Sequence, residues 1–511
     1  MKLPTRAAAF LILVFRTTSQ VFLQLIVCGG FILSPALLLA DTLAAPGDLQ
    51  LRNDLQLLND TGAINIPLTA WPVALGDVDN ALRSIDSEKL GQSQQQALDR
   101  LRDRLSVELE LDTIDYLFGA AAAQGPRVIR SFEDTPRADA EAYAQLSWVG
   151  ERFVMKLAAT YADNPADGDE IRPDGTYLGI ALGNWMLTAG WQDRWFGPGR
   201  DGSLILSNNA RPSPGLAIQR GLSTPFKTKW LSWIGPWTMT SFMTVLDDDR
   251  AVNDTWLFGL RGSFRPLAGL EIGISRTAQW CGDDRPCDLS TFADLLLGND
   301  NKGVNVDPDD EPGNQLGGFD MRWSLPRNIP AAVYMQWIGE DGRGGGGKVG
   351  SWLRQAGVEH WGTIGDASYR MHFELSDTQC REGGFGFSDE KPNCAYEHHI
   401  YRTGYRYKGR ALAHAADADS LSYSIGSTLV QPDGHTWSAT LRHVEINRVG
   451  LPDARHTLSA VPRDLTDVLL THSRVTALGR FYLGIGYNRQ EDAVGGDSTS
   501  DFEAFVRWTS R

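Results

Sequence analysis

The most constraining feature of this chain is an alternation of apolar and polar residues that recurs along its last three quarters. In the segment 319–325, every odd position is apolar and every even position is polar. Side chains alternate across a β-strand, so this segment has one apolar and one polar face. The same pattern occurs in the segments 144–148, 270–275, 369–375, 401–407 and 502–508. Such a series must bury its apolar faces, either in the core of a soluble sandwich or propeller or in the lipid around an outer-membrane β-barrel.

The N-terminus predicts export. Lys2 and Arg6 precede an apolar stretch, and residues 21–40 carry no charge. This pattern is typical of a signal peptide over residues 1–40, with cleavage at Ala40 or as late as Ala45. A retained anchor is the alternative, because about twenty apolar residues can span a bilayer. After Ala40 no uncharged apolar run approaches the ~18 residues of a spanning helix, which excludes a helical membrane protein beyond the leader.

The charge balance bears on partners. The formal net charge is −15, and removal of the leader takes away only positive charges, so the remaining chain is more acidic still. An acidic surface repels polyanions, and nucleic acid is therefore not an expected partner.

Four cysteines lie beyond the leader, in two sequence-local pairs within segments rich in Gly, Asp and Pro. The pairs are Cys281 with Cys287 and Cys380 with Cys394. An even number of cysteines in loops of an exported chain predicts disulfides, here two small clips in extracytoplasmic loops. A zinc site is the alternative, because His398 and His399 follow the second pair, but the spacings match no zinc module.

Residues 46–125 predict a small helical bundle. Asp48 is placed to cap a helix that carries Leu51, Leu55 and Leu58 on one stripe, with Gly62 as its stop. A second short helix is expected from Asp77. A third is expected around the stripe of Ala97, Leu101 and Leu105. Before a barrel, such a unit belongs on the periplasmic side, docked at the barrel mouth; an independent soluble domain on a linker is the alternative.

Residues 126–511 predict the barrel itself. From roughly residue 140 onward, about 370 residues are available for strands and connections. At about 20 residues per strand with its turn, they give about 18 antiparallel strands, an even number as in bacterial barrels. The long connections 283–312, 339–350 and 376–397 belong on the extracellular side. No repeat of fixed period is present, which disfavours a propeller. The segment 502–508 is expected to close the barrel, although Thr509, Ser510 and Arg511 follow its last aromatic residue.

The block from Trp185 to Pro214 concentrates side chains that stack on sugar rings or hydrogen-bond to hydroxyls. Its candidate glycan-binding residues are Trp191, Asp193, Arg194, Trp195, Asn208, Asn209 and Arg211. The structural alternative is a tight turn at 197–199, with the charged side chains in internal ion pairs and the two Asn side chains satisfying backbone groups.

The sequence gives little support to an enzyme. The acidic runs 247–249 and 307–311 offer carboxylates for glycoside hydrolysis or calcium, but acidic surface loops are commoner and neither run has the spacing of a calcium loop. Ser203 and Ser207 lack a Gly-x-Ser-x-Gly elbow. We therefore expect no catalytic residue, no cofactor and no metal.

Several motifs together resemble the Wzi-type capsule assembly family of Gram-negative outer membranes. They are Gly183-Asn-Trp, Trp195-Phe-Gly-Pro-Gly, the run 202–214 with its Asn-Asn-Ala-Arg-Pro, the early run 54–72, Cys281 to Cys287, and the runs 298–301 and 313–320. The resemblance covers about residues 48–325, and the C-terminal third shares only the general style of a barrel.

The resemblance implies an outer-membrane β-barrel of about 18 strands with a periplasmic helical bundle. It further implies a lectin-like protein, not an enzyme, that attaches or organises capsular polysaccharide or exopolysaccharide at the cell surface. We expect a monomer surrounded by outer-membrane lipid and lipopolysaccharide. A porin-like channel and a secreted β-rich carbohydrate hydrolase are the alternatives. In the barrel, Trp323 would face lipid, whereas Asp320 and Arg322 would point into the lumen.

Overall fold

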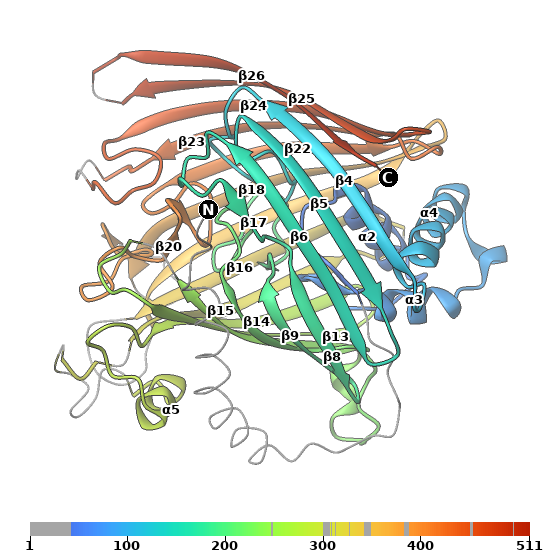
Figure 1. Cartoon of the computed structure of the whole chain (residues 1–511), viewed down its shortest axis with the longest axis horizontal. Coiled ribbons are helices and arrows are strands. Elements are labelled where there is room, and N and C mark those ends of the chain that lie inside the picture. Colours follow the sequence, from blue (N-terminus) through green and yellow to red (C-terminus); the bar gives the residue numbers. More distant parts are fainter. Residues whose placement is uncertain are drawn as a thin grey trace, which may run out of the picture.

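The chain folds into a closed antiparallel β-barrel with a helical unit at one end (Figure 1). The computed structural model describes residues 42–246, 249–299, 307, 309–311, 313–326, 328–341, 349–382, 388–449, 453–493 and 495–510. The predicted signal peptide and Arg511 lie outside these residues.

The wall of the barrel is built from strands of very different length. They are β4 (Ile114–Ala123), β5 (Ala140–Val149), β6 (Phe153–Asp163), β7 (Ile171–Arg172), β8 (Tyr177–Leu182), β9 (Trp185–Trp191), β11 (Pro214–Arg220), β12 (Trp237–Leu246), β13 (Thr255–Leu267), β14 (Leu270–Trp280), β15 (Gly313–Ser324), β16 (Ala331–Asp341), β17 (Val349–Ile364), β18 (Ala367–Glu382), β19 (Glu390–Lys391), β22 (Leu421–Val430), β23 (Thr436–Ile446), β24 (Arg463–Thr476), β25 (Gly479–Asp492) and β26 (Ser498–Thr509).

The strand count matches the prediction. The two-residue strand β7 pairs with the same side of β6 as β8 does, and the two-residue strand β19 pairs with the same side of β18 as β22 does. Each short strand therefore shares one position in the wall with the longer strand. The barrel therefore has 18 strand positions. It closes where β26 pairs with β4, from Phe505 opposite Ala123 to Thr509 opposite Gly119. The expected closing strand at 502–508 is thus confirmed.

The division of faces is also as predicted. In β15, Asp320 and Arg322 are 1% and 3% exposed and point inward, whereas Trp323 between polar neighbours is 46% exposed on the outer face. The outer wall carries many large apolar side chains in this way, and the interior carries the charges. A wall that is apolar outside and polar inside suits a barrel surrounded by lipid.

The barrel begins earlier than predicted. β4 starts at Ile114, inside the range 46–125 that the sequence assigned to the helical bundle, so the boundary at 125 is too late. Residues 120–123 are all alanine, and small uniform side chains hide the alternation that reveals a strand. Tyr116 and Phe118 nevertheless lie on the outer face, 54% and 53% exposed.

One predicted strand is wrong. The alternating segment 401–407 is not part of the wall, and only Arg406 and Tyr407 are extended, as β20 (Arg406–Tyr407) in a small hairpin with β21 (Arg410–Ala411). Tyr401 and Tyr405 are each 1% exposed inside the barrel. Aromatic alternation alone does not distinguish a lipid-facing strand from a segment packed within the lumen, because both bury rings.

The predicted helices are present as α2 (Leu49–Asp60), α3 (Leu75–Arg83) and α4 (Gln92–Glu108), with a short 3₁₀ turn η1 (Ser87–Lys89). The Asp48 carboxylate caps α2 by accepting from Leu51 N at 2.9 Å. Leu55 and Leu98 are fully buried where α2 and α4 pack together. Gln50 donates to Gly434 O at 3.3 Å, in a short turn of the barrel. This contact shows which end of the barrel carries the helical unit.

The two ends of the barrel differ. The end with the helical unit has mostly short turns, for example at 268–269, 365–366 and 477–478, and we call it the short-turn end. The opposite end, called the long-loop end, carries the long connections and helix α5 (Leu289–Leu297), which the sequence did not predict. No helix in the described part of the chain is long and apolar enough to cross a membrane.

Both predicted disulfides are present, Cys281–Cys287 and Cys380–Cys394, with Cα–Cα distances of 4.6 and 5.9 Å. The first closes the end of β14 onto the residues that precede α5. The second ties β18 to the long inward loop that follows it.

We expect the Cys380→Ser/Cys394→Ser double variant to unfold more readily, because this disulfide closes a loop with a sequence separation of 14. Loop-closure entropy gives a loss of about 3 kcal/mol in the free energy of unfolding. Urea unfolding in lipid vesicles measures this loss. The matched control is Cys281→Ser/Cys287→Ser, whose smaller loop predicts a smaller loss. Equal stability of the oxidised wild type and the Cys380/Cys394 variant would contradict the prediction.

Candidate functional site

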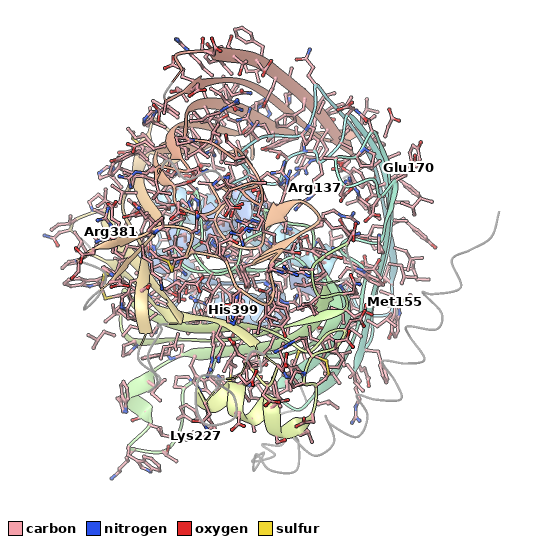
Figure 2. All side chains as sticks on the ribbon, turned by 90° about the vertical axis from the view of Figure 1, so that its left-hand side faces the viewer. Arg137, Met155, Glu170, Lys227, Arg381 and His399 are labelled. Atoms are coloured by element: carbon pink, nitrogen blue, oxygen red, sulfur yellow. A yellow bond between two sulfur atoms is a disulfide. The ribbon has the colours of Figure 1, made fainter. Side chains whose placement is uncertain are left out.

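The candidate site lies in the barrel lumen, which protein segments fill from both ends. The segments 124–139, 192–213 and 388–420 enter from the long-loop end, and we call them together the plug. Within the barrel, β10 (Trp195–Phe196) of the plug pairs with β2 (Ala70–Trp71) of the helical unit. Figure 2 looks onto the long-loop end and shows Arg137 and His399 within the ring of strands, among side chains that crowd the interior.

The Asn-Asn motif joins the three segments of the plug. Asn208 donates through Nδ2 to Phe132 O at 3.1 Å, and Asn209 donates through Nδ2 to Ala411 O at 2.9 Å. Arg137 donates to the carbonyl oxygens of both asparagines, at 2.7 and 3.0 Å. Both asparagines are buried. Their amides therefore satisfy backbone groups of neighbouring segments, the structural role that the sequence left as the alternative.

Trp195 lies where the plug meets the helical unit. Its side chain is 0% exposed and packs edge-to-face on Phe132, with ring centroids 5.3 Å apart. Phe132 in turn lies edge-to-face on Trp71, and the Arg52 guanidinium is 4.2 Å from the Phe132 ring centroid. This aromatic core holds the plug and the helical unit together by burial of large rings.

The charged candidates lie at the outer part of the plug. Arg211 bonds Asp174 at 2.8 Å and Asp167 at 2.7 Å. Burial lowers the pKa of Arg211, but these carboxylates raise it more, so the group stays charged. Burial raises the pKa of Asp193 to about 6, opposed by Arg137. Arg194 donates through Nη1 to Gln192 O at 3.0 Å, and its guanidinium lies 4.3 Å from the Phe242 ring centroid.

The space beside these residues is small. Asp193, Arg194 and Arg211 line a cavity of about 30 Å³. That volume suits about one water molecule and is too small for a sugar ring. Of the predicted glycan-binding residues, Trp191 and Asp193 are half-buried and the others are buried. The structure brings Asp193, Arg194 and Arg211 together and places Trp195 apart from them, in the core that faces the helical unit. The role of the predicted residues in glycan binding stays a prediction.

A buried charge network, which the sequence did not reveal, connects the helical unit, the plug and the wall. Asp60 at the end of α2 bonds Arg322 at 2.6 Å and Arg370 at 2.8 Å. Glu359 bonds the same two arginines at 2.7 and 2.6 Å and also Arg200 of the plug at 3.0 Å. The sequence carried one signal of this network, because Asp60 lies at the C-terminus of a predicted helix. A carboxylate there interacts unfavourably with the helix dipole and needs a cationic partner.

The histidines considered for zinc meet a carboxylate at the long-loop end. Glu311 lies 3.1 Å from His398 Nε2 and 2.9 Å from His399 Nε2. His398 Nδ1 accepts from the backbone N–H groups of Ile400 and Tyr401, at 3.2 and 3.3 Å. Because Nδ1 is an acceptor, Nε2 carries the proton and donates to Glu311. In this tautomer, His398 Nε2 carries a hydrogen and has no free lone pair with which to bind a metal ion.

The acidic runs considered for catalysis or calcium lie in surface loops. Asp249, Asp307, Asp309 and Asp310 are exposed, whereas Asp247, Asp248 and Pro308 fall outside the described residues. Ser203 and Ser207, considered as nucleophiles, donate to the carbonyl oxygens of Phe196 and Ala413. Both hydroxyls are buried and serve to hold the plug.

A closed barrel with an apolar outer wall, a filled charged lumen and a helical unit at its short-turn end defines a class of plugged outer-membrane β-barrel. The family model "Capsule assembly protein Wzi" matches residues 118–492. The chain therefore belongs to the Wzi capsule assembly protein family.

Individual relatives agree with this assignment. The solved structure of Wzi from Escherichia coli aligns with a TM-score of 0.79 and 27% identity, over 91% of this chain and 98% of that one. That protein is described as an outer-membrane, carbohydrate-binding β-barrel involved in group 1 capsule assembly. An uncharacterised 55.8 kDa protein of the Klebsiella pneumoniae cps region is 31% identical over 336 residues. The match covers 65% of this chain and 64% of that relative, less than two thirds of its length.

Proposed function

We propose that this protein is a non-enzymatic, lectin-like protein of the outer membrane that binds capsular polysaccharide or exopolysaccharide and retains it at the cell surface. The observation that carries the proposal is the filled lumen in a member of the Wzi family. In the described part of the chain, buried plug residues occupy the lumen, and this supports the long-loop end as the surface that the polymer contacts. The carbohydrate-binding description of Escherichia coli Wzi supports the same ligand class.

The orientation belongs to the same proposal. Long loops of outer-membrane barrels face the outside and short turns face the periplasm. The helical unit then lies in the periplasm, and the plug opens to the cell surface. We further propose export through the N-terminal signal peptide and a monomeric barrel in contact with lipid and lipopolysaccharide. In this proposal, the predicted glycan-binding residues hold the plug segments that lie beneath the surface of the long-loop end.

A porin is the competing function, and the plug argues against it. Aromatic core residues such as Trp195 and buried ion pairs such as Asp60–Arg322 fill the interior from both ends. We expect the purified protein in planar bilayers to give no stable large openings. Sustained conductance in single-channel recordings would favour the channel.

Gene deletion tests the proposed function. We expect the deletion strain to shed polysaccharide into the medium and to retain less on the cell, while total polysaccharide stays similar, because attachment and not synthesis is lost. The control is complementation with the wild-type gene. Heat-modifiable migration on detergent gels verifies that the folded barrel returns to its wild-type level. Unchanged surface retention in the deletion strain would refute the proposal.

A further inference from the structure

Helix α5 packs on the outside of the barrel wall and not in its lumen (Figures 1 and 2). Phe258 on β13 and Trp280 on β14 belong to the outer faces of their strands, yet they are only 8% and 4% exposed. Phe292 of α5 covers both, with ring centroids 5.4 Å from Phe258 and 4.8 Å from Trp280. Leu295 completes the contact and is fully buried.

A disulfide and several hydrogen bonds fix α5 in this place. The Cys281–Cys287 disulfide joins the end of β14 to the residue before the helix cap. The Asp288 side chain caps the N-terminus by accepting from the backbone of Ser290 at 2.9 Å. At the C-terminus, outward-facing Arg276 of β14 donates to the carbonyl oxygen of Leu296 at 2.5 Å and to that of Leu295. These bonds hold both ends of α5 against the outside of the wall.

The rest of the α5 surface is divided between apolar and polar arcs. Leu289, Ala293 and Leu297 follow one another at i, i+4 and i+8 and therefore form one stripe. Leu289 is 42% exposed, Leu297 is 73% exposed, and Ala293 is also exposed. With about 100° between successive residues, Thr291 lies across the helix from this stripe, and Asp294 lies about 100° from the centre of the stripe. The wall-facing residues lie between the two arcs.

The depth of α5 matches the border of the apolar band. β14 has 11 residues, from Leu270 to Trp280. At ~3.3 Å per residue and a tilt of ~40°, its ends are separated by about 25 Å along the barrel axis, the height of the lipid-facing band of such barrels. The band includes Ile274, which is 61% exposed on the same strand. With Leu270 taken as the short-turn border of this band, Trp280 and α5 lie at its long-loop border.

We propose that α5 is an interfacial helix whose Leu289–Ala293–Leu297 stripe inserts among the acyl chains of the outer leaflet, with Thr291 and Asp294 toward the headgroups and water. The stripe lies on the same outer side of the barrel as the exposed Ile274 of the wall, which is why lipid and not a protein partner is its occupant. The short amphipathic helix then anchors the base of the loop 281–311 at the membrane surface.

Spin labels test this placement in the full chain. Single Leu297→Cys and Ala293→Cys variants, folded into vesicles of phosphatidylcholine and phosphatidylglycerol, are labelled with a nitroxide, and collision rates with oxygen and with a water-soluble nickel chelate are measured. Ile274→Cys on the outer wall is the lipid control, and Asp283→Cys in the exposed loop is the water control. Heat-modifiable migration verifies that each variant is folded before labelling.

We expect the oxygen-to-nickel ratio at 293 and 297 to be close to that at 274 and well above that at 283. Ratios closer to that at 283 would overturn the proposal, because they would place the stripe in water or against protein. The measurement contains no polysaccharide, so its failure is independent of the proposed capsule function.

Discussion

We expect Trp195→Ala to lower the free energy of unfolding by about 3–5 kcal/mol, the usual cost of removing a buried tryptophan. The side chain is fully buried between the plug and the helical unit, against Phe132 and opposite Trp71. The cavity left behind cannot collapse easily, because the barrel wall encloses it. Urea unfolding in lipid vesicles measures the loss, and the yield of folded barrel in the outer membrane should fall with it.

The matched control is Trp230→Ala, because Trp230 is 76% exposed at the short-turn end and its loss should change stability little. Polysaccharide retention per folded molecule should be the same in both variants and in the wild type. A stable, well-folded Trp195→Ala barrel that no longer retains polysaccharide would instead assign this tryptophan a role in glycan binding, either by direct contact or by positioning the plug.

The second large effect is expected for Asp60→Ala. The variant leaves Arg322 and Arg370 buried with only Glu359 between them. Removal of one partner from a buried ion pair leaves an uncompensated charge and costs about 3–5 kcal/mol. Asp79→Ala is the control, because its ion pair with Arg83 is a surface pair at i,i+4 that contributes about 0.3–0.5 kcal/mol. Similar unfolding curves for the two variants would contradict the importance of the network.

The same network predicts a pH dependence. Burial raises the pKa of Asp60, but Arg322 and Arg370 lower it more, to about 2, below its ordinary value of 3.8. Because the pKa is lower in the folded state, the carboxylate stabilises the fold above pH 3.8, and this stability is lost as the pH falls toward 2. We expect the wild type, but not Asp60→Ala, to lose this part of its stability over that interval of pH.

The network also changes an expectation for Arg322. The alternating sequence places this side chain in a crowded lumen. From that position alone, Arg322→Gln would be expected to leave the barrel folded. The contacts with Asp60 and Glu359 show that the guanidinium compensates two buried carboxylates. A neutral amide cannot do so, and a loss of stability is now the expected result.

Much of the fold followed from local patterns. The i, i+4 and i+7 leucines with Asp48 and Gly62 predicted α2, and the dyad of 319–325 predicted both faces of β15. These predictions succeed because burial of an apolar stripe or face has the period of the element that carries it. The cysteine pairs were equally local, since each closes a short loop.

The errors share one physical cause. The tyrosines of 401–407 alternate like a strand but pack inside the lumen, and the alanines of 120–123 form a strand without visible alternation. Helix α5 was missed although Asp288 and Gly298 mark its ends, because its apolar residues surround more than one face. For the tyrosines and for α5, the pattern records which side chains avoid water and not what they pack against; for the alanines, side chains of one size record neither.

The sequence by itself determined a barrel with an apolar outside, a charged inside, a helical unit before it and disulfides in its loops. Only the tertiary structure decided that Trp195, Asn208 and Asn209 hold a plug together and that Asp60 reaches across to Arg322 and Arg370. The physical reason is distance along the chain. Side-chain periodicity is set by neighbours a few residues apart, whereas the lumen is filled by segments that meet only when the barrel closes.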